Sequence, residues 1–174
     1  MSVDILHTIV CVAALTLVCA GLAKLRDPTP AERALRAQRI AIPRGSGRVV
    51  GAVEIAVGVT ALTAATPTTA FVVGVVYAAF AAFVARAARR GTPCGCLGAS
   101  PRAADPLQAV VDLAFAGAAF ASAANDPLSL LDLARTATNG ALYLALVALG
   151  TALAMQAIGP LGELRGLARP EARA

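Results

Sequence analysis

The sequence has little charge for its length. Of its 174 residues only 14% are charged and 58% are apolar. A soluble domain is typically about a quarter charged and about half apolar. This composition disfavours an ordinary soluble domain and is typical of a chain embedded in lipid. The net charge of +5 does not predict a nucleic-acid partner, because no soluble domain is present to carry a basic surface. We interpret it as charge that orients the chain in a membrane.

The first apolar run, residues 3–23, has no Lys or Arg before it. A secretory signal peptide begins with a positively charged region, whereas Asp4 and His7 are the ionisable residues here. Cys19 follows Val18 rather than a small residue, which disfavours a lipoprotein cleavage site. We therefore expect a retained membrane helix, with His7 as an interfacial residue near its outer end.

Four further apolar runs follow, at residues 49–65, 70–88, 107–124 and 137–158. A membrane-spanning helix needs about 20 predominantly apolar residues. The sequence therefore predicts an all-α integral membrane helical bundle with about five transmembrane helices. It forms a single domain over residues 1–160, followed by a polar C-terminal tail at 161–174. We find no internal repeat.

The connections between the runs carry local signals. Thr66-Pro67-Thr68-Thr69 is a short uncharged hairpin, and Asp105-Pro106 is typical of an N-cap followed by the first helical residue. Within the polar connection 24–48, residues 30–41 have the spacing of an amphipathic helix on the membrane surface. A plain loop is the alternative for this segment.

The basic residues are distributed very unevenly between the connections. Seven lie in 24–48, four in 86–106, three in the tail and one in 125–136. Lys and Arg are enriched in cytoplasmic loops. With five spans, this asymmetry predicts a bacterial inner-membrane protein with its N-terminus outside and its C-terminus in the cytoplasm. The loop that contains Cys94 is then cytoplasmic.

Ionisable residues inside membrane segments are costly and usually face protein or water. Glu54 lies within the second run, with Gly51 and Gly58 on the same helical face, and small residues allow close helix packing. Asp112 lies about two turns into the fourth run. Two interpretations stay open: a buried ion pair such as Lys24–Glu54 that holds helices together, or a proton path or cofactor pocket that serves the loop thiols.

The strongest chemical signal is the pair Cys94 and Cys96, separated by Gly95 and followed by Gly98. Glycine permits the tight backbone that a Cys-x-Cys bridge needs. Strained disulfides are the exchangeable, oxidising kind, and nearby Arg residues favour the thiolate. Two sulfurs are fewer than the four ligands of a structural zinc site, so we expect no metal. Redox exchange is the favoured interpretation, with metal binding and a structural turn as alternatives.

Cys11 and Cys19 are eight residues apart on one predicted helix, about 12 Å along its axis. Bridged cysteines have Cα atoms within about 7 Å, so these two cannot form a disulfide. We interpret Cys11 as a buried small hydrophobic residue. Cys19 lies at the depth of the loop thiols, where an electron-relay role is the alternative to simple packing.

Three segments in this order resemble a known family. They are residues 20–28 (AGLAKLRDP), residues 51–58 (GAVEIAVG) and residues 94–98 (CGCLG). Over about residues 1–124 the chain resembles the methylamine-utilisation MauE-like proteins, membrane relatives of the DoxX family. It departs from them at Leu97, where the family usually has an aromatic residue, and at Asp112, where a basic residue is common.

The resemblance implies a DoxX-like four-helix core with one extra C-terminal helix here. It also implies a role in maturing methylamine dehydrogenase, whose small subunit is rich in disulfides, with a thioredoxin-like partner. That maturation is periplasmic, whereas the charge asymmetry places the thiols on the cytoplasmic side. Electrons that cross the bilayer, cytoplasmic thiol substrates and a re-entrant loop are three ways to reconcile the two.

We therefore expect thiol–disulfide exchange between Cys94 and Cys96 and a thioredoxin-like partner or a membrane carrier such as a quinone. Gly95, Gly98, Glu54, Lys24 and Cys19 are the supporting residues. The alternative is a non-catalytic membrane scaffold that stabilises a partner enzyme, such as an amine dehydrogenase subunit. A small-solute transporter is a third hypothesis, which is disfavoured because the sequence shows no inverted repeat.

Overall fold

The computed structural model describes residues 2–43, 45–95 and 104–158. All regular structure in these ranges is helical. The helices are α1 (Ser2–Arg26), α2 (Thr29–Ala37), α3 (Ser46–Thr63), α4 (Pro67–Arg90), α5 (Pro106–Ala123), α6 (Leu130–Thr136) and α7 (Gly140–Ile158). The prediction of an all-α fold is confirmed.

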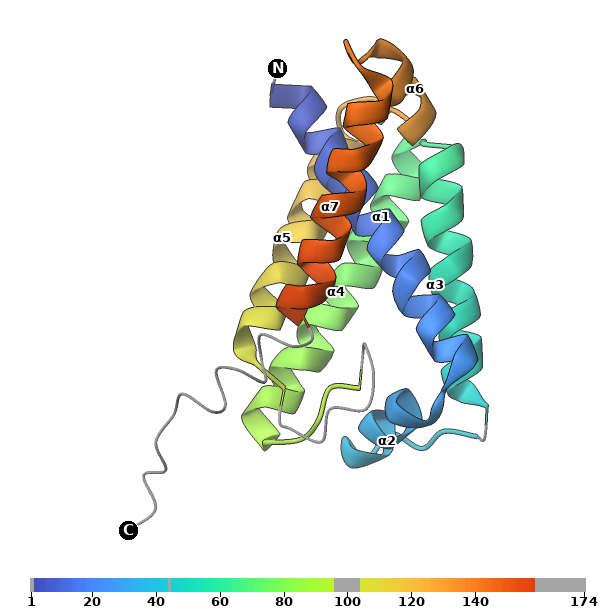
Figure 1. The fold of residues 1–174 in the computed structure, drawn as a ribbon. Helices are drawn as coiled ribbons and strands as arrows, with labels where there is room; N and C mark the ends of the chain where they lie inside the picture. Colours follow the sequence, from blue (N-terminus) through green and yellow to red (C-terminus); the bar gives the residue numbers. More distant parts are fainter. Residues whose placement is uncertain (1, 44, 96–103, 159–174) are drawn as a thin grey trace.

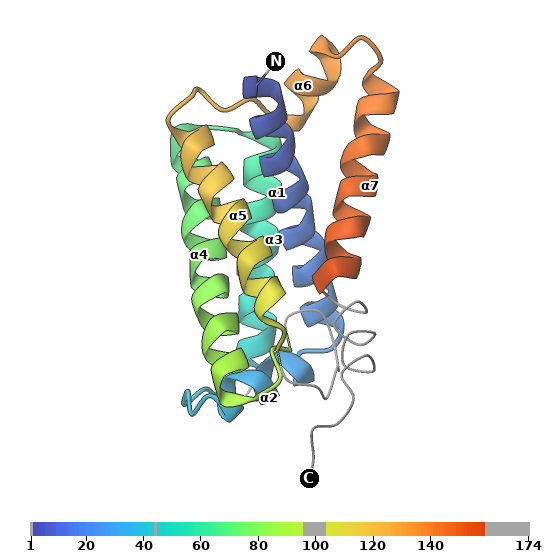
Figure 2. The same ribbon diagram turned by 90° about the vertical axis from the view of Figure 1, so that its left-hand side faces the viewer.

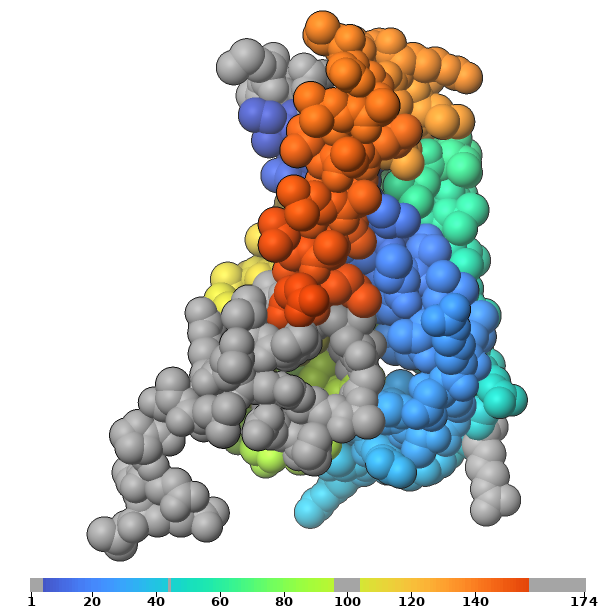
Figure 3. Space-filling model, in the orientation of Figure 1, coloured from blue at the N-terminus to red at the C-terminus, as the bar shows by residue number. Residues whose placement is uncertain are grey.

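Four long helices form an antiparallel bundle (Figures 1 and 2). α1 packs mainly against α3 and α4 mainly against α5, and the two pairs meet chiefly where α1 contacts α5. α2 lies across one end of the bundle, whereas α6 lies at the other (Figure 1). α7 packs against α1, and Figure 3 shows it lying along one face of the molecule.

In the part of the chain that the structure describes, four helices are long and apolar enough to cross a membrane: Ile5–Arg26, Ser46–Thr63, Pro67–Arg90 and Pro106–Ala123. The apolar stretch of α7, Gly140–Gln156, is shorter. Large aliphatic side chains such as Val49, Val110 and Leu153 are more than half exposed, as expected where helices face lipid tails. The protein is therefore a helical membrane bundle, as the sequence predicted.

The ends of the helices follow local sequence signals. Thr66 caps α4: its hydroxyl accepts from the Thr69 N–H while the Thr69 hydroxyl accepts from the Thr66 N–H. Asp105 caps α5, with Oδ1 accepting from the Leu107 N–H at 2.9 Å. The Asp105 cap confirms the predicted start of α5. The predicted hairpin at residues 66–69 is wrong in its bounds, because α4 already begins at Pro67 and the connection from α3 is residues 64–66. For the segment predicted as helix or loop at residues 30–41, α2 shows a helix over Thr29–Ala37.

One end of the bundle holds α2, the end of α4 and the start of α5 (Figure 1). We call it the basic end, because the described residues 24–43, 45–48 and 86–95 carry nine of the 15 Lys and Arg residues. The opposite end holds α6, a short helix that the sequence analysis did not predict. Its N-cap is Ser129, whose hydroxyl accepts from the Asp132 N–H.

Glycines let α1 and α3 approach closely. A Cβ atom added to Gly21 would lie 2.5 Å from the Gly51 carbonyl oxygen, and one added to Gly58 would lie 2.6 Å from the Ala14 carbonyl oxygen. Neither site has room for a side chain, so the backbones themselves are in contact. The predicted close packing on the Gly51–Gly58 face is confirmed.

His7 is not at the lipid interface, contrary to the sequence expectation. Its side chain is buried, with 2% exposed. The reason is the central position of α1, which contacts α3, α5, α6 and α7, so that several of its faces are covered by protein rather than lipid. Cys11 is buried on the same helix with Leu133 and Val147, in agreement with its predicted packing role.

Candidate functional site

The loop after α4 is closed at its base by backbone hydrogen bonds. Gly91 ends α4 in the left-handed conformation, at φ 63°, and the Thr92 N–H donates back to the Ala87 carbonyl at 3.0 Å. The Thr92 carbonyl then accepts from the Ala104 N–H at 3.0 Å. The segment that leaves α4 and the segment that enters α5 are thus joined at Thr92 and Ala104. Cys94 lies two residues after Thr92.

Cys94 lies against the start of α5. The Gln108 side-chain amide donates to its Sγ at 3.4 Å. Gln108 is only 7% exposed, and Cys94 is half-buried. The other predicted thiol, Cys96, and Gly98 lie outside the described residues. The structure therefore describes one sulfur of the predicted pair and gives it a buried hydrogen-bond donor.

Gly95 is required by its surroundings. Its φ is +66°, in the left-handed region, and a Cβ added there would collide with the Pro30 carbonyl oxygen and lie 2.9 Å from the Ala34 Cβ. The loop therefore packs directly on α2. Both the positive φ and the close packing therefore require glycine at this position, and the packing on α2 is a reason that the sequence did not show.

α2 is itself fixed to the bundle. The Gln38 side-chain amide, 1% exposed, donates to the Phe83 carbonyl on α4 at 3.1 Å. The Arg90 guanidinium donates to the Gln38 carbonyl at 3.5 Å. Ala31 and Ala34 are buried on the inner face of α2. The surface on which the cysteine loop rests is therefore attached to the α4 helix that leads into the loop.

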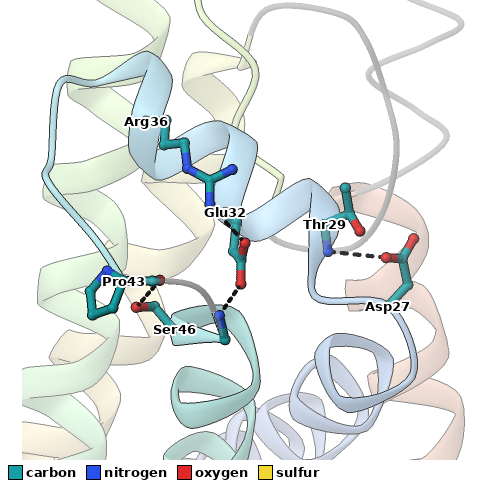
Figure 4. A network of polar contacts seen from close by, with 7 residues as sticks. Asp27, Thr29, Glu32, Arg36, Pro43 and Ser46 are labelled. Carbon is teal, nitrogen blue, oxygen red and sulfur yellow. Dashed lines mark hydrogen bonds and ion pairs between the residues drawn. The ribbon is translucent and has the colours of Figure 1, made fainter.

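Polar contacts hold the first turn of α2 (Figure 4). Glu32 Oε1 accepts from the Gly45 N–H at 2.9 Å, at the start of α3, and Glu32 Oε2 accepts from Arg36 at 3.0 Å. Just before the helix, Asp27 Oδ1 accepts from the Thr29 N–H at 3.0 Å. Hydrogen bonds from the side chain and backbone of Thr29 hold the pKa of the Asp27 carboxyl below its usual range.

The predicted Lys24–Glu54 ion pair is present. Lys24 Nζ donates to Glu54 Oε2 at 2.8 Å, and the side chains are 8% and 2% exposed. The pair joins the end of α1 to the middle of α3, next to the contact between Gly21 and Gly51. An ion pair this deep is strongly destabilised when one partner is removed, so the contact ties the two helices together.

A second polar cluster lies between the four long helices. The Tyr77 hydroxyl donates to the Ala13 carbonyl at 2.7 Å and also interacts with Thr16. Glu54 and Asp112 are both near enough to interact electrostatically with Tyr77. Glu54 Oε1 and Asp112 Oδ2 are buried without a hydrogen-bond partner among the described residues. Such unsatisfied oxygens are uncommon in protein interiors.

Of the predicted site residues, Lys24 and Glu54 contact each other, and Gly95 packs the loop against α2. Cys19 is a half-buried thiol on α1, bonded to no other described cysteine. The sequence analysis missed Gln108 and Tyr77. A signal for Gln108 was available, because it lies four residues before Asp112 and so shares its helical face.

A comparison with family models matches residues 2–125 to the methylamine utilisation protein MauE family. The chain belongs to the MauE family. The match covers α1 to α5, and therefore includes the cysteine loop and the ion pair. Neither a curated protein nor a solved structure matches the chain. The MauE region is thus the four-helix bundle with α2, and α6 and α7 lie beyond it.

Proposed function

We propose that this MauE protein performs thiol–disulfide exchange in methylamine utilisation, with Cys94 and Cys96 as its redox pair. The observation that supports this most is the setting of Cys94. Its sulfur receives a hydrogen bond from a buried amide, in a loop braced by α2 and closed at its base. A turn with only a structural role has no need of a buried donor to sulfur.

The proposed reaction conserves atoms and electrons. A thiolate of a reduced partner attacks the Cys94–Cys96 disulfide, a mixed disulfide forms, and the displaced sulfur leaves as a thiolate. A second partner thiolate then displaces the loop sulfur, so that the partner is oxidised and the loop holds two thiols. The same steps run in reverse with an oxidised partner. A thioredoxin-like protein has the two cysteines that both directions require.

We propose a thiol protein, rather than a quinone, as the direct partner of the loop. The described side-chain contact of the Cys94 sulfur is with the Gln108 amide, and exchange with a partner thiol needs no further binding site in the bundle. A quinone would need a site of its own, and the buried polar atoms without a hydrogen-bond partner among the described residues, on His7, Gln38, Glu54, Asp112 and Ser122, are where such a site would be sought.

The family assignment suggests the final substrate. An amine dehydrogenase subunit that contains disulfides needs an oxidant or isomerase while it matures, and a membrane dithiol pair with a thioredoxin-like partner is suited to that task. On this proposal the protein acts on the disulfides of the dehydrogenase through its partner.

Labelling of the thiols with maleimide tests the redox proposal. In membranes poised oxidising and then reducing, we expect Cys94 and Cys96 to label weakly and then strongly, together. Cys11 labels weakly in both states, because its side chain is only 3% exposed. A loop that stays reduced at every poise, combined with full cellular function of the double Cys94→Ser/Cys96→Ser variant, would favour the scaffold alternative.

The charge asymmetry supports a specific topology, with the basic end in the cytoplasm. Reporter fusions after Thr68 and Asp126 are expected to read as exterior, and fusions after Arg39 and Arg173 as cytoplasmic. Fusions at Thr68 and Arg39 are the sharpest pair, since they flank α3 alone. A cytoplasmic signal at Thr68 would rule out this orientation and would move the cysteine loop to the outer face.

A further inference from the structure

We propose that Gln108 is a positioning residue for the redox pair: its amide holds the Cys94 sulfur at the start of α5 and stabilises that sulfur as a thiolate. The inference rests on the proposed thiol–disulfide exchange and assigns unequal roles to the two cysteines. Cys94 becomes the inner sulfur, which carries the negative charge, and Cys96 becomes the sulfur that meets the partner.

Among the described residues at the start of α5, the backbone N–H groups up to Gln108 already have acceptors. Pro106 has no N–H, the Leu107 N–H donates to Asp105 Oδ1, and the Gln108 N–H donates to the Asp105 carbonyl at 3.0 Å. A helix start usually offers its first backbone N–H groups to an anion, but here those of Leu107 and Gln108 already have acceptors. The side-chain amide of Gln108 supplies a donor in their place.

The Gln108 side chain is buried. It is 7% exposed and lies in the first turn of α5, on the buried face of the helix, with Asp112 one turn further along. A buried amide that donates to sulfur has lost water as an alternative partner. Hydrogen bonds to a charged acceptor are markedly stronger than those to a neutral one. The contact therefore favours the thiolate of Cys94 over its thiol.

The Cys94 sulfur is held in place by the contacts of its neighbours in the loop. Cys94 lies between Thr92, which is bonded to Ala87 and Ala104, and Gly95, which packs on Pro30 and Ala34. The loop cannot easily swing Cys94 away from Gln108 without breaking these contacts. A fixed donor at a sulfur that develops charge needs no rearrangement during the reaction.

The proposed exchange starts at Cys96. The partner thiolate attacks Cys96 Sγ, the bond between Cys96 and Cys94 breaks, and its electron pair moves to Cys94 Sγ, where the Gln108 amide donates. In the reverse step the Cys94 thiolate attacks the mixed disulfide, and the partner sulfur leaves as a thiolate. A sulfur stabilised as a thiolate is the better leaving group, so attack at Cys96 is favoured over attack at Cys94.

The rate at which Cys94 is alkylated by a small neutral reagent, as a function of pH, tests the proposal. The background is the full chain with Cys11, Cys19 and Cys96 replaced by serine. We expect Gln108→Met to move the midpoint pH upward by about one unit, which corresponds to a thiolate fraction about tenfold lower below the midpoint. Gln108→Glu moves it at least as far, because a carboxylate replaces the donor.

The shape of the profile separates a hydrogen bond from a change in access. Loss of thiolate stabilisation shifts the midpoint and raises the plateau at high pH by roughly threefold, because a more basic thiolate is more nucleophilic. Altered access changes the plateau and leaves the midpoint in place. Charged groups on the surrounding helices are kept in every variant: Glu32 and Arg33 on α2, Arg89 and Arg90 on α4, and Asp105 and Asp112 at α5. A midpoint that stays fixed in both Gln108 variants overturns the proposal.

Tyr77→Phe is the matched control. Tyr77 is also buried, 2% exposed, and also donates a side-chain hydrogen bond, but to the Ala13 carbonyl on α1 rather than to the loop. We expect its midpoint to stay within about 0.3 units of the parent. An equal shift in this variant would overturn the specific role of Gln108. Because the assay uses no partner protein, a failure of partner exchange would refute the proposed function without altering this result.

Discussion

Replacing Glu54 by glutamine is expected to lower the free energy of unfolding of the detergent-solubilised bundle by about 3 kcal/mol. Breaking one side of a buried ion pair costs about 3–5 kcal/mol, and the lower value applies because unfolded membrane helices also find polar partners. In this variant the ammonium group of Lys24, which is 7% exposed, faces an uncharged amide instead of a carboxylate. Denaturation monitored by circular dichroism measures the loss.

The Lys24→Met variant tests whether the two residues act as a pair. Alone it should cost a similar amount, because it leaves Glu54 buried without its cation. The double variant should lose less than the sum of the single losses, by about 2 kcal/mol. Strict additivity would contradict the energetic coupling inferred from the 2.8 Å contact.

Asp112→Asn provides a matched control for Glu54→Gln. Asp112 is an acid of similar burial, 3% exposed, and makes no ion pair with a described residue. The same carboxyl-to-amide change should therefore cost less than about 1 kcal/mol, because no paired charge is left behind. Equal losses at Glu54 and Asp112 would show that burial alone, rather than the pairing with Lys24, sets the cost.

The parts of the fold that composition and periodicity determine were predictable. Long apolar runs became long helices, Asp105 became a helix cap, and the glycine face around Glu54 became the contact with α1. The Lys24–Glu54 pair followed from two charges near the same depth in neighbouring spans. Each of these features depends on residues close in sequence or on the cost of charge in lipid.

Other features depend on tertiary contacts that sequence spacing does not reveal. His7 is buried because other helices surround α1, and no local pattern shows this. Gln108 is a polar residue near a helix start, where an exposed side chain is usual, and its link to Cys94 requires the loop to fold back on α5. The stability of α2 as a platform likewise depends on Gln38 reaching α4.

The unequal roles of the two thiols lead to the final prediction. Cys94→Ser is expected to accumulate a mixed disulfide between Cys96 and a thioredoxin-like partner, visible as a reducible adduct on a non-reducing gel. The variant lacks the inner thiolate that would otherwise attack this bond and release the partner. Removing the partner's own resolving cysteine should stabilise the same adduct, because that thiol is the other group able to break it.

The comparison with Cys96→Ser distinguishes an ordered pair from two interchangeable thiols. Cys94 is half-buried, and its sulfur accepts a hydrogen bond from Gln108. The next residue, Gly95, packs on α2. A partner sulfur therefore has poor access to Cys94. We expect Cys96→Ser to trap at least about tenfold less adduct, which corresponds to about 1.4 kcal/mol in the attack step. Equal trapping would contradict the assignment of Cys94 as the inner sulfur. If neither variant forms an adduct with any thioredoxin-like protein, exchange with such a partner is excluded, and a scaffold held together by Lys24 and Glu54 becomes the better account of the bundle.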